Sequence, residues 1–293
     1  MKKSKVMLFG AMALTAGLAL AACGSSQSSN ADKTYSYIFV SNPDTLDYIT
    51  STRDSTSSIT TNLIDGLLEN DQYGNLIPSM AESWTVSKDG LTYTYKIRQG
   101  AKWYTSEGEE YADVTAHDFV TGLKYAADKK AENLYLVQDS IKGLADYVEG
   151  KSSDFGTVGV KAVDDYTLQY TLNQPETYWN SKTTASILNP VNEAFLKSKG
   201  DDFGSVTPSS ILSNGPYLFK SFSSKSLIEF DKNPNYWDKD NVKIEKVKLS
   251  FFDGSDQDSI ARGFLDGNYT DGRIFPTSSV FAELKKGNED KIT

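Results

Sequence analysis

The sequence predicts an α+β protein, because runs of strand-like segments and runs of helix-like segments follow one another along the chain. Alternating apolar residues at 34–40 and 91–98 are typical of half-buried strands, whereas apolar residues at 59–68 recur at helical spacing. The elements do not alternate strictly between strand and helix, which argues against a doubly wound parallel sheet. A length of 293 residues suffices for one large domain or two ordinary ones.

The first half of the chain contains the clearest element signals. The strand at 34–40 places aromatic residues on one face, and the helix expected over 59–68 is followed by a turn at 70–75. Asp89-Gly90 predicts a tight hairpin turn before the strand at 91–98, since glycine tolerates a positive φ. This half therefore reads as strand, helix and hairpin.

The next expected element is a helix that Thr115 caps, with Asp118 at the third helical position as a capping box. Residues 158–172 predict two short strands around an Asp-Asp turn. A helix expected over 189–199 has proline in its first turn and glycine after its end. The remaining expectations are strands at 218–230 and 242–252 and short helices at 256–265 and 278–286.

The composition excludes several kinds of partner and site. Asp and Glu number 39 against 30 Lys and Arg, and a formal net charge of -9 repels phosphate backbones, so we expect no nucleic-acid partner. One His and one Cys leave no His-cluster or Cys-rich metal site and no intramolecular disulfide. We therefore expect no metal and no cofactor.

Patterns that resemble catalytic motifs are incomplete. Gly150-Lys151-Ser152 lacks the first glycine of a phosphate loop, because Ala145 occupies that place. His117 falls in the first turn of the expected helix, where a simple polar role is the alternative to catalysis. Acidic residues between 253 and 258 fit the start of a helix better than a calcium loop. We expect that the chain is not an enzyme.

The N-terminus has the pattern of an export signal. Three lysines precede an apolar stretch that ends Leu20-Ala21-Ala22-Cys23 and resembles a bacterial lipobox. This predicts a signal peptide at 1–22, a lipidated Cys23 and a flexible tether over 23–33. An ordinary signal peptide, cleaved after Ala22 to leave a free thiol, is the alternative. The predicted location is the extracellular face of the cell membrane, held by a lipid anchor.

Short phrases spread along the chain resemble one family. They are Asn42-Pro43-Asp44-Thr45-Leu46-Asp47, Asp65-Gly66-Leu67-Leu68-Glu69, Ala81-Glu82-Ser83-Trp84, Gly100-Ala101-Lys102-Trp103, Thr115-Ala116-His117-Asp118-Phe119, Asn214-Gly215-Pro216-Tyr217 and Asn233-Pro234-Asn235-Tyr236-Trp237. In this order they are similar to the dipeptide- and oligopeptide-binding lipoproteins of bacterial ABC importers, solute-binding protein family 5. The streptococcal, Gram-positive members are the most similar.

The resemblance implies a fold and partners. The fold is a periplasmic-binding-protein-like type II lobe, a mixed sheet with helices, in which 34–70 and 181–293 form domain I and 71–180 an inserted domain II. Because members of this family are about twice as long, we expect the second lobe to be missing and the chain to be truncated and impaired in binding. The implied partners are oligopeptides and an ABC permease complex in the membrane.

The resemblance also implies where peptide binds. The family runs an extended segment along the ligand, and on that alignment Thr52, Arg53 and Asp54 are the candidate contacts. Tyr135 and Gln138, from the expected inserted domain, are weaker candidates, with the aromatic ring placed to stack on ligand. Arg53 and Asp54 fit either the peptide termini or a surface ion pair worth under about 1 kcal/mol.

Two alternatives to peptide transport stay open at this point. Nickel, haem, sugars and dipeptides are other ligands of the same fold, although a single His does not favour nickel or haem coordination by this part. The second alternative is a surface lipoprotein with an adhesin or signalling role and no transport activity.

The lipobox pattern predicts the behaviour of a Cys23→Ala variant. Without the thiol there is no acceptor for the lipid, so the variant should stay uncleaved by the lipoprotein peptidase or be released from the cell. Cell fractionation with mass analysis of the N-terminus measures this. A processed Cys23→Ala protein that still fractionates with membranes would contradict the prediction.

Overall fold

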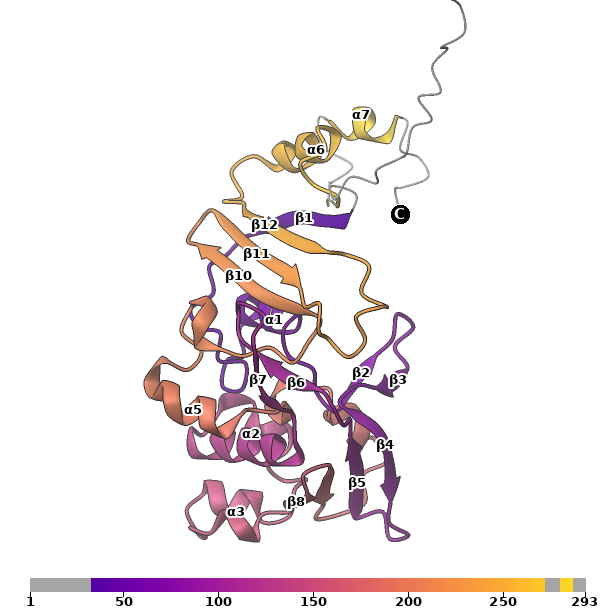
Figure 1. Ribbon diagram of the computed structural model, residues 1–293, viewed down its shortest axis with the longest axis vertical. Coiled ribbons are helices and arrows are strands. Elements are labelled where there is room, and N and C mark those ends of the chain that lie inside the picture. Colours follow the sequence, from indigo (N-terminus) through magenta and orange to yellow (C-terminus); the bar gives the residue numbers. More distant parts are fainter. Residues whose placement is uncertain (1–32, 272–279, 287–293) are drawn as a thin grey trace, which may run out of the picture. The chain divides into compact units, whose positions relative to one another are not determined.

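The computed structural model describes residues 33–271 and 280–286. The expected signal peptide, Cys23 and most of the tether lie outside these residues, as do the first two residues of the helix expected at 278–286. The described chain from Lys33 onward forms one compact unit. It contains two four-stranded sheets and two two-stranded ones (Figure 1).

The strands are β1 Thr34–Phe39, β2 Leu68–Asn70, β3 Leu76–Pro78, β4 Ala81–Val86, β5 Thr92–Ile97, β6 Lys102–Tyr104, β7 Glu110–Asp113, β8 Val160–Asp164, β9 Thr167–Thr171, β10 Tyr217–Ser223, β11 Leu227–Lys232 and β12 Lys246–Phe251. The α-helices are α1 Asp54–Thr60, α2 Ala116–Asp128, α3 Leu144–Val148, α4 Trp179–Lys182, α5 Glu193–Lys199, α6 Gln257–Leu265 and α7 Phe281–Lys285. The 3-10 helices are η2 Glu132–Leu136, η3 Phe155–Thr157, η4 Ser186–Leu188, η5 Gly200–Asp202 and η6 Pro208–Ser210.

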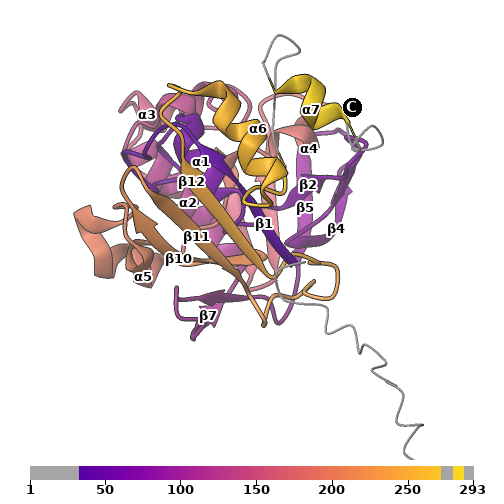
Figure 2. The ribbon, with the colours of Figure 1, turned by 90° about the horizontal axis from the view of Figure 1, so that it is seen from above.

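The first large sheet joins the beginning of the described chain to its end. Its strand order is β1-β12-β11-β10, with β1 parallel to β12 and the other pairs antiparallel (Figure 2). Tyr35, Val247, Phe230 and Phe219 stand in one cross-strand row on one face. The opposite face is charged, as the Lys246–Asp231 ion pair at 2.8 Å illustrates. This alternation confirms the strand expected at 34–40.

The second large sheet has the order β4-β5-β9-β8, all antiparallel, and α2 packs on β8 and β9. Its inner face buries Tyr95, Tyr170 and Trp179, and the Tyr95 hydroxyl donates to Asn180 Oδ1 at 2.6 Å. The expected hairpin turn is confirmed at Gly90, whose φ is +73°. The strands of the first large sheet all lie within predicted domain I, and those of the second all lie within predicted domain II. The domain boundaries stay a prediction.

The capping box expected at the start of α2 is present. The Asp118 carboxylate accepts a hydrogen bond from the Thr115 backbone N–H at 2.8 Å, and it also accepts one from the Trp103 indole at 3.1 Å. On the same helix, Gly122 lies so close to the backbone of the 189–191 segment that a Cβ there would stand 2.2 Å from the Asn189 carbonyl oxygen. The absence of a side chain at Gly122 thus allows α2 to pack against this segment.

The helix expected over 59–68 is wrong in its extent. Helix α1 ends at Thr60, residues 61–67 form turns and connecting backbone, and Leu68 starts β2. The physical reason is that a distant side chain competes with the helix for the backbone hydrogen bonds of Asp65. The Asn214 side chain accepts from the Asp65 N–H at 2.9 Å and donates to the Asp65 carbonyl at 3.1 Å. The helically spaced apolar residues are nevertheless buried, with Leu63 and Leu67 at 0% exposure.

Two further expectations need correction. The helix expected from residue 189 begins only at Glu193, where the Asn192 side chain accepts from the Phe195 N–H at 3.0 Å. Asn189 is extended because it precedes Pro190. The expected strand 218–230 is two strands, β10 and β11, joined by a short turn. The two strands expected within 158–172 and the helix at 256–265 are confirmed.

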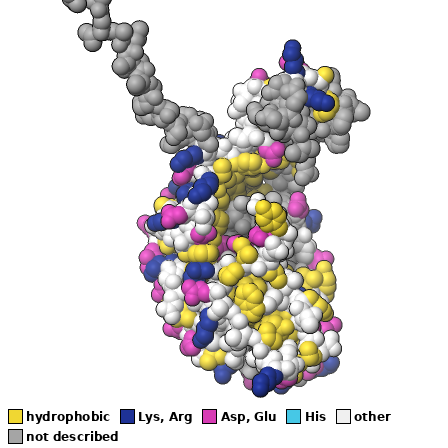
Figure 3. Space-filling view, turned by 90° about the vertical axis from the view of Figure 1, so that its right-hand side faces the viewer, with side chains coloured by type: hydrophobic (Ala, Val, Ile, Leu, Met, Phe, Trp, Pro, Cys, Tyr) yellow, Lys and Arg dark blue, Asp and Glu magenta, His cyan; other side chains and the backbone are white. Residues whose placement is uncertain are grey.

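Apolar side chains are also present on the surface. Figure 3, the view onto the right-hand side of Figure 1, shows hydrophobic side chains over the middle of this face and charged ones mainly along its margins. The most exposed large apolar residues of the described chain are Tyr73 at 79%, Tyr135 at 74% and Val40 at 67%. No helix in the described ranges has the length and apolarity to span a bilayer.

The close contact at Gly122 generates a stability prediction. Alanine normally favours a helix interior by about 1 kcal/mol over glycine, yet here its methyl group would meet a backbone carbonyl. Gly122→Ala should therefore destabilise the protein by roughly 2 kcal/mol or more, measured by urea unfolding. Thr121→Ala on the same helix is the control and should change stability by less than about 1 kcal/mol. A stabilised Gly122→Ala variant would contradict this packing.

Candidate functional site

A buried carboxylate fixes the chain path just before the predicted site. Asp47 is 7% exposed and accepts hydrogen bonds from the Ile49 and Thr50 N–H groups, each at 3.1 Å, and from the Thr50 hydroxyl at 2.6 Å. The hydroxyl of Tyr125, on α2, donates to the same carboxylate at 2.9 Å. Burial, followed by the negative charge of Asp47, raises the pKa of Tyr125 well above its ordinary value. These bonds hold the turn at 47–50 against α2.

Residues 51–53 then connect this turn to α1, and Arg53, just before the helix, has an extended backbone. The Arg53 N–H bonds to the Ser51 hydroxyl at 3.2 Å, and the Arg53 carbonyl accepts from the first turn of α1. Within the described residues, the backbone N–H and C=O of Thr52 have no hydrogen-bond partner. Exposed backbone groups without a partner can pair with the backbone of another, extended chain.

A second segment lies against this one. The Thr52 hydroxyl donates to Glu132 Oε2 at 3.1 Å, which joins residues 51–54 to η2. Leu134 anchors η2 in the core at 3% exposure, whereas Tyr135 is 74% exposed. The two groups of residues that the sequence singled out, Thr52 to Asp54 and Tyr135, therefore belong to neighbouring segments of one surface.

The charged side chains of this surface are free of local ion pairs. Arg53, Asp54 and Glu132 are exposed, and none of them forms an ion pair within the described residues. One of the two sequence-based interpretations was an ion pair between Arg53 and Asp54. The structure does not contain that ion pair. Gln138 is partly buried, and its backbone N–H bonds to the Leu134 carbonyl at 2.8 Å. No described contact links the Gln138 side chain to residues 52–54.

Glu132 is the member of this surface that sequence reasoning missed. The signal available in the sequence was weak, since Glu132 is one of 39 acidic residues and lies three positions before Tyr135. Only the hydrogen bond from Thr52, 80 residues away in the chain, identifies it. We refer to residues 51–54, Glu132 and Tyr135 as the candidate surface.

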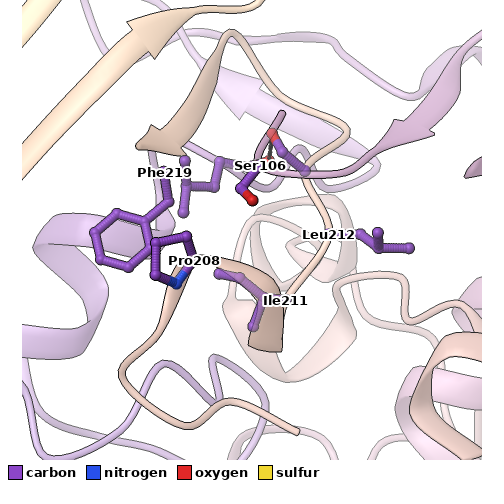
Figure 4. Close-up of a pocket in the computed structure, with 7 residues that line it drawn as sticks. Ser106, Pro208, Ile211, Leu212 and Phe219 are labelled. Carbon is purple, nitrogen blue, oxygen red and sulfur yellow. Dashed lines mark hydrogen bonds between the residues drawn. The ribbon is translucent and has the colours of Figure 1, made fainter. Parts of the chain in front are cut away.

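A small pocket elsewhere in the protein does not overlap the candidate surface. It has an empty volume of about 170 Å³, below the usual size of ligand sites. Its lining residues are Leu63, Ser106, Pro208, Ile211, Leu212, Ser213 and Phe219 (Figure 4). An oligopeptide does not fit there, so an open surface is the better candidate for binding.

The residues of the family-like phrases meet inside the protein, in what we call the Asp65 cluster. The Asp65 carboxylate accepts from the Tyr236 hydroxyl at 2.7 Å and the Trp237 indole at 3.2 Å. The Arg98 guanidinium lies 3.7 Å from the centroid of the Trp237 ring. Asn214 completes the cluster through its bonds to the backbone of residue 65.

Three members of the Asp65 cluster are buried, whereas Trp237 and Arg98 are partly exposed. Asp65 is 7% exposed, Asn214 2% and Tyr236 7%. Burial raises the pKa of Asp65 to about 6, although hydrogen bonds from Tyr236 and Trp237 act in the opposite direction. The hydrogen bonds of Asp65, Asn214 and Tyr236 are thus internal to the fold.

The incomplete catalytic patterns have ordinary structural partners. Lys151 forms ion pairs with Glu149 at 2.5 Å and Asp146 at 3.7 Å. The His117 imidazole lies 3.4 Å from the Asp165 carboxylate, and both side chains are exposed. Asp256 caps α6 by accepting from the Asp258 N–H at 3.1 Å.

The fold and this open surface define one lobe of a solute-binding protein. The chain matches the family model of bacterial extracellular solute-binding proteins, family 5 Middle, over residues 75–293, and it belongs to that family. The resemblance seen in the short phrases is thereby confirmed.

Named relatives agree with this assignment. The chain is 62% identical to the oligopeptide-binding protein AliA of Streptococcus pneumoniae, over 100% of this chain and 44% of AliA. It is 60% identical to SarA of Streptococcus gordonii, over 100% of this chain and 45% of SarA. The structure of Listeria monocytogenes OppA bound to peptide matches 88% of this chain and 49% of that one, with a TM-score of 0.77 and 29% identity. The chain thus spans about half the length of these relatives.

The Tyr125–Asp47 bond leads to a prediction for the candidate surface. Tyr125→Phe removes one donor from a buried carboxylate and should cost about 1.5–3 kcal/mol of unfolding free energy. It should also speed proteolysis between residues 47 and 54. Tyr147→Phe is the matched control, because Tyr147 donates to the exposed Asp128 at 2.6 Å and should contribute less than about 1 kcal/mol. Equal losses in the two variants would show that burial of Asp47 has no special effect.

Proposed function

We propose that this chain is the first lobe of an oligopeptide-binding protein that delivers peptides to an ABC importer. The observation that carries the proposal is Thr52, an exposed residue with free backbone groups, whose hydroxyl donates to Glu132 in the same 3-10 helix as the exposed Tyr135. The relatives named above are oligopeptide-binding proteins, which supports peptide as the ligand class. The proposed role is binding and delivery, without catalysis.

The proposed binding mode is backbone pairing. A peptide laid in extended form along residues 51–54 exchanges hydrogen bonds with the Thr52 N–H and C=O, which recognises the peptide whatever its side chains. The Tyr135 ring offers an apolar face for one side chain or peptide plane. Arg53, Asp54 and Glu132 supply charges of both signs near the ends of such a peptide.

The proposed location follows from the N-terminal pattern. Cys23 carries the lipid, residues 24–33 form a tether, and the lobe stands on the extracellular face of the membrane beside its permease. The proposed division of the lobe is domain I at 34–70 and 181–293, with domain II at 71–180 inserted. The separation of the two large sheets along the sequence supports that division.

By itself, this stretch of chain should bind peptide weakly. It spans about half of its relatives, and the candidate surface is open on its outer side. Losing about 3 kcal/mol of contacts from an opposing wall weakens binding roughly a hundredfold. We therefore place the dissociation constant in the high micromolar range or above.

An NMR titration of the isotope-labelled chain with unlabelled mixed oligopeptides tests the proposal. Peptide should shift the resonances of residues 51–54 and 132–135, and Tyr135→Ala should weaken the fitted affinity about tenfold through loss of one stacking contact of roughly 1.4 kcal/mol. Tyr73→Ala is the matched control, because Tyr73 is equally exposed at 79% but belongs to the turn between β2 and β3.

Two results would contradict the proposal. Equal loss of affinity in the Tyr135 and Tyr73 variants would show that binding is a general effect of exposed tyrosines. Submicromolar binding by this chain alone would show that one wall is sufficient.

A further inference from the structure

Glu132 presents a carboxylate that has one oxygen already held in place. The Thr52 hydroxyl donates to Glu132 Oε2 at 3.1 Å, and the Glu132 side chain is exposed. Within the described residues no donor reaches the other oxygen, Oε1, which can only accept hydrogen bonds. Because the bond from Thr52 restricts the side chain, a ligand group that binds the carboxylate has less conformational entropy to overcome.

The positive side chains close to Glu132 in the described chain do not neutralise it. Arg53, next to Thr52, and Lys130, two residues before Glu132, are exposed and form no ion pair within the described ranges. The Lys129 Nζ lies 5.8 Å from the centroid of the Tyr125 ring. The negative charge of Glu132 is therefore available to a positive group of a ligand.

The ring of Tyr135 shares one face of η2 with this carboxylate. Side chains three positions apart in a 3-10 helix lie one above the other, and Glu132 and Tyr135 have that spacing in η2. The two residues between them, Asn133 and Leu134, are buried at 8% and 3% exposure, whereas Tyr135 is 74% exposed. The outward face of η2 thus combines a positioned carboxylate with an exposed aromatic ring.

A carboxylate and an aromatic ring on one face are suited to an ammonium or guanidinium group. The carboxylate accepts N–H bonds from the cation, and the negative face of the ring attracts its charge. We propose that Glu132 and Tyr135 form a binding site for a cationic group of the peptide, its N-terminal ammonium or a Lys or Arg side chain. This inference rests on the proposed function, since the cation belongs to the peptide that lies along residues 51–54. In this site Thr52 is the positioning residue for Glu132, through its hydroxyl.

NMR titration of the isotope-labelled chain with matched peptides tests the site. The probes are an oligoalanine peptide with one central lysine, the same peptide with norleucine in place of lysine, and the N-acetylated form of each. At neutral pH, loss of the recognised charge should weaken binding about fivefold, the combined effect of one exposed ion pair and one cation–π contact. Weakening by norleucine identifies a side chain as the source of the cation, and weakening by acetylation identifies the N-terminal ammonium.

Variants separate this site from the general attraction of an acidic protein for cations. Glu132→Gln retains an acceptor for the Thr52 hydroxyl but removes the charge, and it should reduce the fivefold preference to about twofold. Glu109→Gln is the matched control, at an exposed glutamate between β6 and β7, and should keep the preference. Thr52→Val should also lower the preference, and Thr52→Ser should restore it because serine retains the hydroxyl.

The outcomes distinguish this inference from the proposed function. Equal affinities for charged and neutral peptides, with resonances of residues 51–54 and 132–135 still shifting, would overturn the cation site and leave the proposed function in place. A preference that falls equally in Glu132→Gln and Glu109→Gln would assign it to the overall charge of the protein and would also overturn the site. No shift with any of the peptides would contradict the proposed function itself, and the cation site with it.

Discussion

The buried carboxylate of Asp47 sets the path of the chain on which the rest of the candidate surface depends. Its oxygens accept from two backbone N–H groups and two hydroxyls, one of them on α2. An unsatisfied carboxylate at 7% exposure would be costly, so the turn at 47–50 has little freedom to move. That turn leads into Thr52 and Arg53 at the surface, and the Thr52 backbone groups have no partner in the described chain.

Buried polar networks of this kind give several of the recognisable phrases of the sequence a role in the fold. Asp65, Asn214 and Tyr236 come from three distant phrases, and the other two both bond to Asp65 inside the protein. Gly215 has the same architectural meaning, because a Cβ at that position would stand 2.7 Å from the backbone of Leu63. The candidate surface consists of residues with exposed side chains, where sequence alone provides few restraints.

The sequence predicts much of the fold because local signals and tertiary contacts agree over most elements. The alternation of apolar and polar residues over 92–97 and the Thr115–Asp118 capping box are both local in the sequence. They can therefore be recognised without knowledge of any distant contact. The predicted helix over 59–68 is wrong in its extent, although its buried leucines have helical spacing. The Asn214 side chain forms hydrogen bonds with the backbone N–H and C=O of Asp65, which a helix would have used internally. Thr52 and Tyr135 were accessible only through family resemblance, and Glu132 only through a contact that spans 80 residues of chain.

In the proposed binding mode, a peptide pairs its backbone with the free groups of Thr52. The most direct measurement is the solvent-exchange rate of the Thr52 amide proton, by NMR, with and without a saturating oligopeptide. We expect fast exchange in the free protein and clear slowing on peptide addition, with little change in the already bonded Thr50 amide. An unchanged Thr52 exchange rate at saturation, with protection appearing at another segment instead, would contradict it.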